Sequence, residues 1–212
     1  MKKINTLLAA SVLAATAGVS APVMADLSAN AGFVSDYYYR GKTLGDAAMY
    51  AGADYESGGF YAGVWAIDDG NTGNNGLEYD VYLGYGMDLG GVSVSVGYTD
   101  YSYTANSDSE TEYNLSVGLG AFSLDYADGE DNNTTEADYD YEFYSLSWGG
   151  EVFGAVVGSY DGDNDEDYNY VELSASGEVS GLDVTATIGT KDEDGSDEDG
   201  YMILDISKSF DL

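Results

Sequence analysis

Hydrophobic and polar residues alternate one by one along much of this chain. In residues 77–89 (LEYDVYLGYGMDL) the odd positions are apolar or aromatic, whereas the even positions hold Glu78, Asp80, Tyr82, two glycines and Asp88. Because a β-strand shows successive side chains to opposite faces, this segment predicts a strand with one apolar and one polar face. Strands of soluble proteins usually end after about five or six residues. This one is long enough to cross a membrane, which takes about 9 to 11 residues in a tilted strand.

The alternation recurs along the chain. It is clear in the segments that begin at Leu27, Val92, Tyr113, Phe122, Val171, Leu182 and Met202. Segments 48–56, 60–67 and 152–160 are strand-like, without a clear preference of face. Within residues 139–148 the apolar positions change parity between Phe143 and Tyr144, which predicts a β-bulge. No segment sustains the spacing of an amphipathic helix, so we expect about twelve strands and no helix.

The connections between these segments are short and long in turn. The short ones carry glycine: 57–59, 90–91, 120–121, 149–150 and 180–181. The long ones are polar: 40–47, 68–76, 104–111, 128–138, 161–167 and 191–200. Outer-membrane barrels have this arrangement. The sequence therefore predicts an all-β fold, a transmembrane antiparallel up-and-down β-barrel of about twelve strands (about 10 to 14), with short periplasmic turns and long acidic extracellular loops.

The N-terminal segment predicts export. Lys2 and Lys3 precede an apolar stretch at residues 7–19, and the small residues Val23 and Ala25 follow it. This is the layout of a secretory signal peptide, so we expect residues 1–25 to be removed after Ala25. An N-terminal membrane anchor is the alternative, but the apolar stretch is short for a spanning helix. Residues 26–212 would then form one barrel domain in the cell outer membrane.

Composition limits the chemistry that this chain can perform. It has no cysteine and no histidine, and its one proline lies in the predicted signal peptide. Thiolate chemistry, disulfides and catalytic arrangements that depend on histidine are therefore excluded. We expect no enzymatic activity and no cofactor. The 29 glycines and 21 tyrosines suit a chain of many strands and tight turns.

Aromatic residues fall near the predicted strand ends. Beside the long connections lie Tyr79, Tyr98, Tyr101, Tyr103, Tyr113, Tyr126, Tyr139, Tyr141, Tyr160, Tyr168, Tyr170 and Tyr201, and beside the tight turns or the C-terminus lie Phe60, Phe122, Phe153 and Phe210. Barrels of this class carry an aromatic girdle at each membrane interface. We expect these residues to form the two girdles, although tyrosine is also common in strands generally.

Two short elements carry a family resemblance. The first is Ser-Asp-Tyr-x-x-Arg-Gly, with Ser35, Asp36, Tyr37, Arg40 and Gly41 in those places. The second is Gly-Phe-Tyr-Ala-Gly-Val-Trp at residues 59–65. With the C-terminal Ser-Lys-Ser-Phe, they make the chain similar to the TorF-type porin family of small proteobacterial outer-membrane proteins. The close match covers roughly the first forty residues after the signal peptide, and it implies a barrel with a porin role.

Charge is the most uneven property of the chain. It has 39 acidic and six basic residues, a formal net charge of −33. Many of the acids fall in the later long connections, so the extracellular mouth is expected to be strongly negative. Such a surface attracts cations and repels anions, and nucleic acid is excluded as a partner. Solubility or a saline habitat would explain the same acids without a selectivity role.

One acidic connection has the spacing of a calcium-binding loop. The oxygen donors are Asp161, Asp163, Asp165, Asp167 and Glu172, at positions 1, 3, 5, 7 and 12 of that loop. However, the sixth position is Glu166 instead of the required glycine, and no flanking helices are predicted. We expect loose divalent-cation binding, bridging to lipopolysaccharide, in preference to a specific calcium site.

Parity within the predicted strands also suggests which residues line the lumen. The candidate pore-lining residues are Asp36, Tyr38, Arg40, Glu78, Asp80, Tyr82, Asp125, Glu172 and Asp183. Ionisable side chains inside a barrel require water or a partner, which predicts a hydrated lumen. Arg40, the sole arginine, falls among carboxylates. It either shapes a constriction or tethers the first loop.

These observations leave two functions open. The first is a porin-like channel for passive diffusion of cations or small polar solutes. The second is a non-conducting structural or adhesive barrel whose interior is filled by side chains. In either case the expected partners are outer-membrane lipid, lipopolysaccharide and, during biogenesis, the outer-membrane assembly machinery.

Overall fold

The computed structural model describes residues 26–68, 76–104, 108–132, 138–163, 167–193 and 199–212. The predicted signal peptide, residues 1–25, lies outside this part of the chain. All regular structure in the described residues is β-strand. Within the same residues there is no helix with the length and apolar character that crossing a membrane requires.

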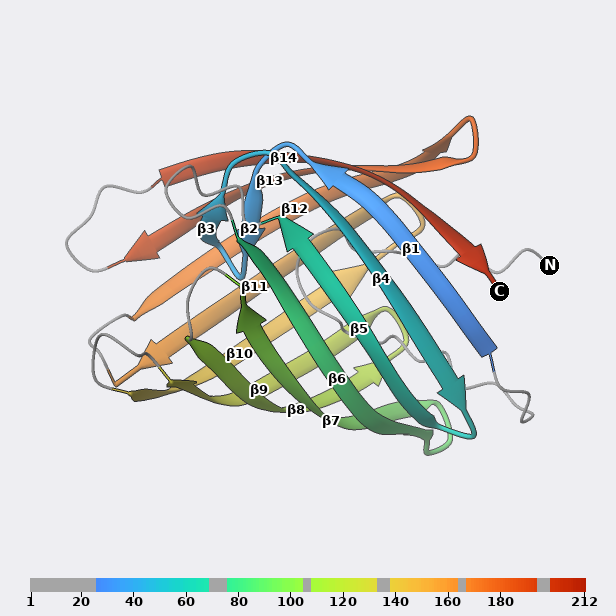
Figure 1. Cartoon of the computed structure of the whole chain (residues 1–212), viewed down its shortest axis with the longest axis horizontal. Coiled ribbons are helices and arrows are strands. Elements are labelled where there is room, and N and C mark those ends of the chain that lie inside the picture. The colour runs from blue at the N-terminus through green and yellow to red at the C-terminus, as the bar shows by residue number, and fades with distance from the viewer. Residues whose placement is uncertain (1–25, 69–75, 105–107, 133–137, 164–166, 194–198) are drawn as a thin grey trace.

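Twelve antiparallel strands form a closed barrel (Figure 1). They are β1 (Asp26–Val34), β4 (Ala48–Ser57), β5 (Phe60–Asp68), β6 (Leu77–Asp88), β7 (Val92–Tyr103), β8 (Ser109–Leu119), β9 (Phe122–Asn132), β10 (Tyr139–Gly149), β11 (Phe153–Gly162), β12 (Tyr168–Val179), β13 (Leu182–Glu193) and β14 (Asp199–Asp211). Each strand pairs with its neighbours in sequence order, and β1 closes the barrel by pairing with both β4 and β14. The predicted architecture and strand number are confirmed.

The two ends of the barrel differ in their connections. The turn end carries the five predicted tight turns, together with Asp26 and Leu212 at the ends of the described chain. At one of these turns Gly90 and Gly91 both have positive φ, which glycine adopts at no steric cost. The loop end carries the longer connections, which are in large part outside the described residues. In Figure 1 the loop end is on the left.

The outer surface of the barrel is apolar. On β6 the six outward side chains from Leu77 to Met87 are each 42–48% exposed, whereas Glu78, Asp80 and Tyr82 are buried inside. The predicted alternation on β6 is thus confirmed. A soluble protein rarely exposes a continuous apolar surface of this kind, and a membrane barrel requires it. The apolar face therefore contacts lipid.

The β-bulge predicted near Phe143 is wrong. β10 pairs in continuous register with β9 and β11, and its alternation is unbroken. Tyr141 and Phe143 are buried inside, and Glu142 is exposed on the outer side. The pattern misled because here the inward residues are aromatic and one outward residue is charged. Apolar character marks the outer face only where the strand lies in the membrane.

The predicted loop-side girdle is only partly correct. Tyr79 and Tyr113 are exposed on the outer face, and Tyr98 and Tyr126 lie on the same face of their strands. The other residues assigned to that girdle point inward: Tyr101, Tyr103, Tyr139, Tyr141, Tyr160, Tyr168, Tyr170 and Tyr201. They occupy inward positions of strands that pack against a segment inside the barrel. Phe60, Phe122, Phe153 and Phe210 are exposed at the turn end.

Six inward tyrosines lie directly across from a glycine on the neighbouring strand. The pairs are Gly32–Tyr50, Gly63–Tyr82, Gly84–Tyr61, Gly129–Tyr141, Gly158–Tyr170 and Gly189–Tyr201. In each pair a Cβ atom on the glycine would collide with the tyrosine ring. The ring therefore lies flat over the bare backbone, which is one use of glycine in a strand interior.

Candidate functional site

A β-hairpin lies inside the loop-end half of the barrel. It consists of β2 (Tyr37–Tyr39) and β3 (Lys42–Gly45), in the connection between β1 and β4. Figure 1 shows it apart from the barrel wall, and its residues contact β6, β7, β8, β10, β12 and β14. We call this element the inner hairpin. It brings part of a predicted long connection into the interior.

The turn of the inner hairpin consists of Arg40 and Gly41. Both have positive φ, 50° for Arg40 and 80° for Gly41. Two-residue hairpin turns with this backbone favour Asn-Gly or Gly-Gly, so an arginine there is unusual. Gly41 approaches the ring of Tyr170 so closely that a Cβ atom would collide with it. The contacts that Arg40 makes with the barrel wall hold this strained turn in place.

Arg40 forms a bidentate ion pair with Glu112 of β8. Its Nη1 and Nη2 donate to the two carboxylate oxygens at 2.5 and 3.0 Å. The guanidinium also stacks over Phe143, with Cζ 3.9 Å from the ring centroid. Arg40 is 3% exposed and Glu112 is fully buried. Burial lowers the pKa of Arg40, but the Glu112 carboxylate, together with Tyr39 and Tyr101, outweighs burial and raises that pKa well above its usual range. The ion pair therefore stays charged.

Glu112 accepts three further hydrogen bonds from the barrel wall. Tyr101, Tyr141 and Asn114 donate to it at 3.1, 2.9 and 2.9 Å. Five donors around one carboxylate balance the cost of burying its charge. The barrel wall thus holds the Glu112 carboxylate in position to accept the hydrogen bonds of Arg40.

The two faces of β2 in the inner hairpin are bound on opposite sides of the lumen. Tyr37 donates to Glu78 of β6 at 2.8 Å, and Tyr39 shares a 2.9 Å hydrogen bond with Tyr101 of β7. On the other side Tyr38 stacks on Tyr201 of β14 with ring centroids 4.1 Å apart. Tyr201 in turn donates to Glu172 of β12 at 2.7 Å. The inner hairpin is therefore fixed to strands all around the barrel.

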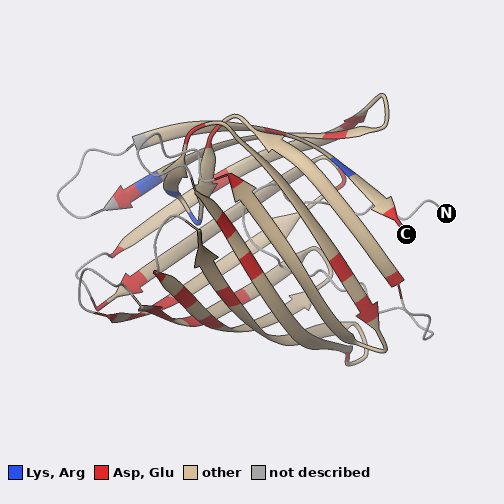
Figure 2. Cartoon of the chain, viewed as in Figure 1, with Lys and Arg blue, Asp and Glu red and all other residues tan. Residues whose placement is uncertain are grey.

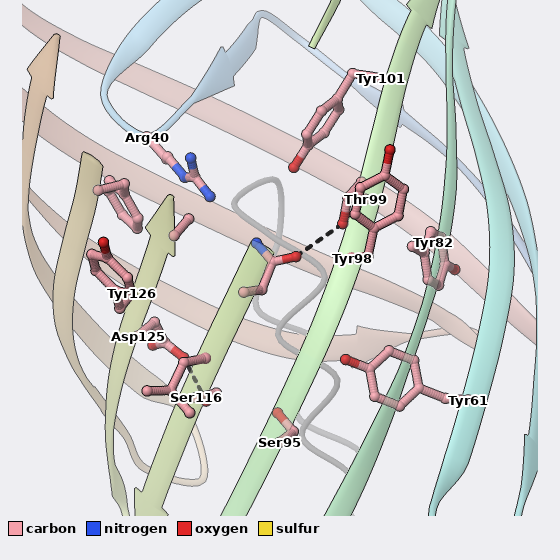
Figure 3. Close-up of a pocket in the computed structure, with 14 residues that line it drawn as sticks. Arg40, Tyr61, Tyr82, Ser95, Tyr98, Thr99, Tyr101, Ser116, Asp125 and Tyr126 are labelled. Atoms are coloured by element: carbon pink, nitrogen blue, oxygen red, sulfur yellow. Dashed lines mark hydrogen bonds between the residues drawn. The ribbon is translucent and has the colours of Figure 1, made fainter. Parts of the chain in front are cut away.

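Toward the turn end, below the inner hairpin, the interior changes character. The inward positions there hold small polar residues such as Ser95, Thr99, Asn114 and Ser116, and Ser116 donates to Asp125 at 2.6 Å. These residues and Arg40 line a cavity of about 50 Å³, shown in Figure 3. A cavity of this size has room for water beside these polar groups. The interior thus has an aromatic, hairpin-filled half and a small-residue, polar half.

Acidic positions outnumber basic ones along the barrel strands (Figure 2), and carboxylates also outnumber cations in the interior. Those placed inside by burial or by a contact include Asp54, Glu78, Asp80, Glu110, Glu112, Asp125, Glu172 and Asp205. The cations near them are Arg40, Lys42 and Lys191. Among the described residues, Oδ1 of Asp80 is a buried oxygen without a hydrogen-bond partner. The interior therefore favours positive charge.

The predicted pore-lining residues do not form one group. Tyr38 and Arg40 lie on the inner hairpin, and Asp36 lies just before it. Glu78, Asp80, Tyr82, Asp125 and Glu172 line the wall, and Asp183 lies near Asp205 on the turn side. Arg40, Glu78, Asp80 and Tyr38 all lie at the level of the inner hairpin, with Tyr38 on the opposite side from Glu78. Asp125 and Asp183 lie below it.

The residues of the predicted calcium-type spacing are dispersed. Asp161 and Asp163 are exposed, Asp167 accepts a hydrogen bond from the amide of Gly162, and Glu172 is buried inside the barrel. Asp165 lies outside the described residues. Within the described ranges no three acidic side chains are placed to share a metal ion.

Sequence reasoning missed the main partners of Arg40. Glu112 is not among the predicted site residues, and the prediction places its hydrogen-bond donors Tyr101 and Tyr141 in the girdle. It also places there Tyr201, which stacks on Tyr38 of the inner hairpin. A usable signal was the pairing of inward tyrosines with glycines, because both fall on the polar parity of their strands. Tyrosine on that parity indicates a packed interior instead of an interface.

Comparison with known proteins gives a family. The Gcw_chp family, described as a bacterial protein of unknown function, matches residues 16–210. No curated protein sequence matches this chain at a significant level.

The solved structures to which this chain is similar include the following three. Pseudomonas aeruginosa OpdK with vanillate is 14% identical with a TM-score of 0.47, over 79% of this chain and 57% of that chain. Acinetobacter baumannii OccAB4 is 9% identical with a TM-score of 0.47, over 85% and 57%. Pseudomonas aeruginosa OccK2 (OpdF) in complex with glucuronate is 13% identical with a TM-score of 0.47, over 88% and 66%. This chain spans less than two thirds of the length of these proteins.

Proposed function

This chain belongs to the Gcw_chp family of bacterial proteins of unknown function, and from its own geometry we propose that it is a small outer-membrane channel for passive diffusion of cations and small polar solutes. The observation that carries the proposal is the interior. A barrel used only as a scaffold can fill its lumen with apolar side chains, whereas this one is lined by carboxylates, hydroxyls and amides. Such a lining is stable where water enters.

The inner hairpin would be the narrowest part of the path. It carries Arg40 to the middle of a ring of strands and leaves small polar side chains below it. The path would follow the predicted pore-lining set, from Asp36, Tyr38 and Arg40 past Glu78, Asp80 and Tyr82. Asp125, Glu172 and Asp183 would line its lower and opposite walls. Carboxylates along a narrow path concentrate cations and slow anions.

The proposed setting is the outer membrane of a Gram-negative cell. The turn end would face the periplasm after removal of residues 1–25, and the loop end would face lipopolysaccharide. Acidic loops at that end would attract cations to the mouth and hold divalent ions loosely. The outer-membrane assembly machinery would insert the barrel, and neither an enzymatic reaction nor nucleic-acid binding is part of the proposal.

One observation favours a second function, a non-conducting structural or adhesive barrel. At the level of the inner hairpin Arg40 and Glu112 are almost completely buried, and rings stack from Tyr38 to Tyr201 and from Phe143 to Tyr170. A hairpin packed this closely and held permanently would seal the lumen. The two functions differ in whether ions pass.

Planar lipid bilayers separate the two functions. Purified protein should give steady single-channel steps, and a KCl gradient should give a reversal potential of the sign expected for cation preference. Arg40→Ala should raise the conductance, because it removes the side chain that fixes the hairpin across the lumen. R40M/E112L is the companion variant, since it removes the charge pair while it retains side-chain volume. Silence of the parent protein would support the sealed barrel, and unchanged conductance in both variants would exclude the inner hairpin as the constriction.

A further inference from the structure

The outer face of β9 and β10 has an unusually short apolar band. Three apolar pairs face outward across these strands: Phe122 with Trp148, Leu124 with Leu146, and Tyr126 with Tyr144. The side chains of Phe122, Leu124, Leu146 and Trp148 are 39–59% exposed, so none of them is covered by protein. Both interfaces of a membrane barrel are marked by aromatic residues. Here only one pair of leucines separates the two aromatic pairs.

Carboxylates follow directly on the loop side of this band. Asp128 lies across from Glu142 and Glu130 lies across from Asp140, and all four are exposed. Like charges opposite one another on two strands repel, and a carboxylate in hydrocarbon is costly. Tyr126 and Tyr144 both donate hydrogen bonds to Glu142, at 2.7 and 3.1 Å. Hydroxyl and carboxylate groups together fix the edge of the hydrocarbon at Tyr126 and Tyr144.

The other edge of the band is fixed by the turns. Phe122 follows the Gly120–Ala121 turn, and Trp148 precedes Gly149, Gly150 and the exposed Glu151. From one aromatic pair to the other the chain advances four residues, about 13 Å along the strand. At the usual strand tilt this corresponds to a band about 10 Å tall.

β6 shows what an ordinary band looks like in the same barrel. Its outward residues are apolar from Leu77 to Met87, about 34 Å along the strand and about 25 Å in height. Leaning the whole barrel in the membrane would raise one side relative to the other. It would leave the band on β9 and β10 just as short. The mismatch therefore has to be taken up beside these two strands.

We propose that the lipid bilayer is locally thinned beside β9 and β10, to about two fifths of its thickness beside β6. Lipid covers this face because the outward residues of the short band are apolar and exposed. Carboxylates also mark the edge of the band, at the level where headgroups would lie. The acyl chains at this face would bend or splay so that both headgroup layers reach the two aromatic pairs. The thinned region would exist whether or not the barrel conducts ions.

Tryptophan depth measurements test this proposal. Trp65 lies inside the barrel and Trp148 lies on the short band, and these are the two tryptophans of the chain. W65F leaves Trp148 as the reporter of the turn-side edge, and W65F/W148F/Y126W reports the loop-side edge. W65F/W148F/L83W places a matched control at the middle of the band on β6. Each variant is reconstituted in phosphatidylcholine vesicles that contain lipids brominated either near the headgroup or near the end of the chain.

Lipids brominated near the headgroup should quench both edge reporters about twofold more than lipids brominated near the end of the chain. The control on β6 should show the opposite preference. Two positions about 10 Å apart cannot both be shallow in a bilayer whose hydrocarbon core is about 30 Å thick. Strong quenching of either edge reporter by the deep bromines would therefore overturn the proposal. Weak quenching of both by every lipid would overturn it as well, since that result means that a second copy or another protein covers the face. Far-UV circular dichroism confirms that each variant is folded.

Discussion

Arg40, in the turn of the inner hairpin, and Glu112, on β8, hold each other by two N–H···O bonds in a place that is closed to solvent. The two residues are 72 positions apart in the chain. Their pair joins a strained turn to the barrel wall, so it decides where the inner hairpin lies.

Glu112→Ala should lower the free energy of unfolding by about 3–5 kcal/mol, because it leaves a buried guanidinium without its partner. R40M/E112L should recover most of that loss, since it removes both charges and fills the space. Urea unfolding in lipid vesicles, followed by tryptophan fluorescence, measures the two variants against the parent protein. A double variant as unstable as E112A would mean that the ion pair itself, instead of the unpaired charge, controls stability.

Glu78→Gln with Asp80→Asn should weaken cation preference. Both residues are buried in the wall beside the inner hairpin, and Oδ1 of Asp80 has no hydrogen-bond partner among the described residues. Neutral amides retain the shape and remove up to two negative charges from the proposed path. The reversal potential in a KCl gradient should move toward zero. E151Q, at an exposed turn, is the control, and an equal shift in both proteins would show that the wall carboxylates do not set selectivity.

Gly158→Ala should destabilise the barrel by about 1–3 kcal/mol, the usual cost of overpacking. Its Cβ would collide with the ring of Tyr170, which also lies against Gly41 and Phe143. Gly177→Ala is the matched control, because it lies in β12 with open space around its Cβ and should change stability by less than about 0.5 kcal/mol. Urea unfolding compares the two, and similar values would show that the tyrosine moves aside freely.

Stability should fall at alkaline pH. Burial raises the pKa of Tyr37 and of Tyr39 well above the ordinary value of about 10, and Glu78 and Asp80 add to the effect at Tyr37. The folded protein therefore keeps these protons where the unfolded chain loses them. Stability is unaffected below about pH 10 and decreases as pH rises further.

Urea unfolding at about pH 8 and about pH 11 measures this slope. Y37F/Y39F should flatten it, since two of the phenols that hold their protons are gone. A double variant with the slope of the parent protein would assign the effect to other groups.

The barrel could be predicted from the sequence because each strand has one face toward lipid and one face toward a polar interior. On β6 lipid selects apolar residues such as Leu77 and Val81 outside, and the polar interior selects Glu78 and Asp80 inside. This contrast is visible in one chain without any partner. Toward the loop end of β10 the contrast is reversed, because Phe143 packs inward and Glu142 faces out, and there the predicted bulge was wrong.

The site around Arg40 was less predictable, because its residues lie far apart in the sequence. Residues 37–45 are too few and too mixed in character to indicate strands, and the clearest local signal is a glycine after Arg40. Parity could place Arg40 among carboxylates but could not select Glu112, since that choice depends on the register of strands far apart in the chain. The predicted girdle failed on the same ground, because Tyr141 and Tyr201 look identical to interfacial tyrosines until their partners are known.

The position of the inner hairpin also constrains the order of assembly. The hairpin is made early in the chain, yet Tyr38 packs on Tyr201 of the last strand, and that strand pairs with β1 immediately before the hairpin. A partly assembled sheet lacks half of the surfaces that hold the hairpin. Closure of the barrel and seating of its hairpin are therefore one cooperative event, and an unfinished barrel would still have an accessible Arg40–Gly41 bond that the finished one hides from proteases.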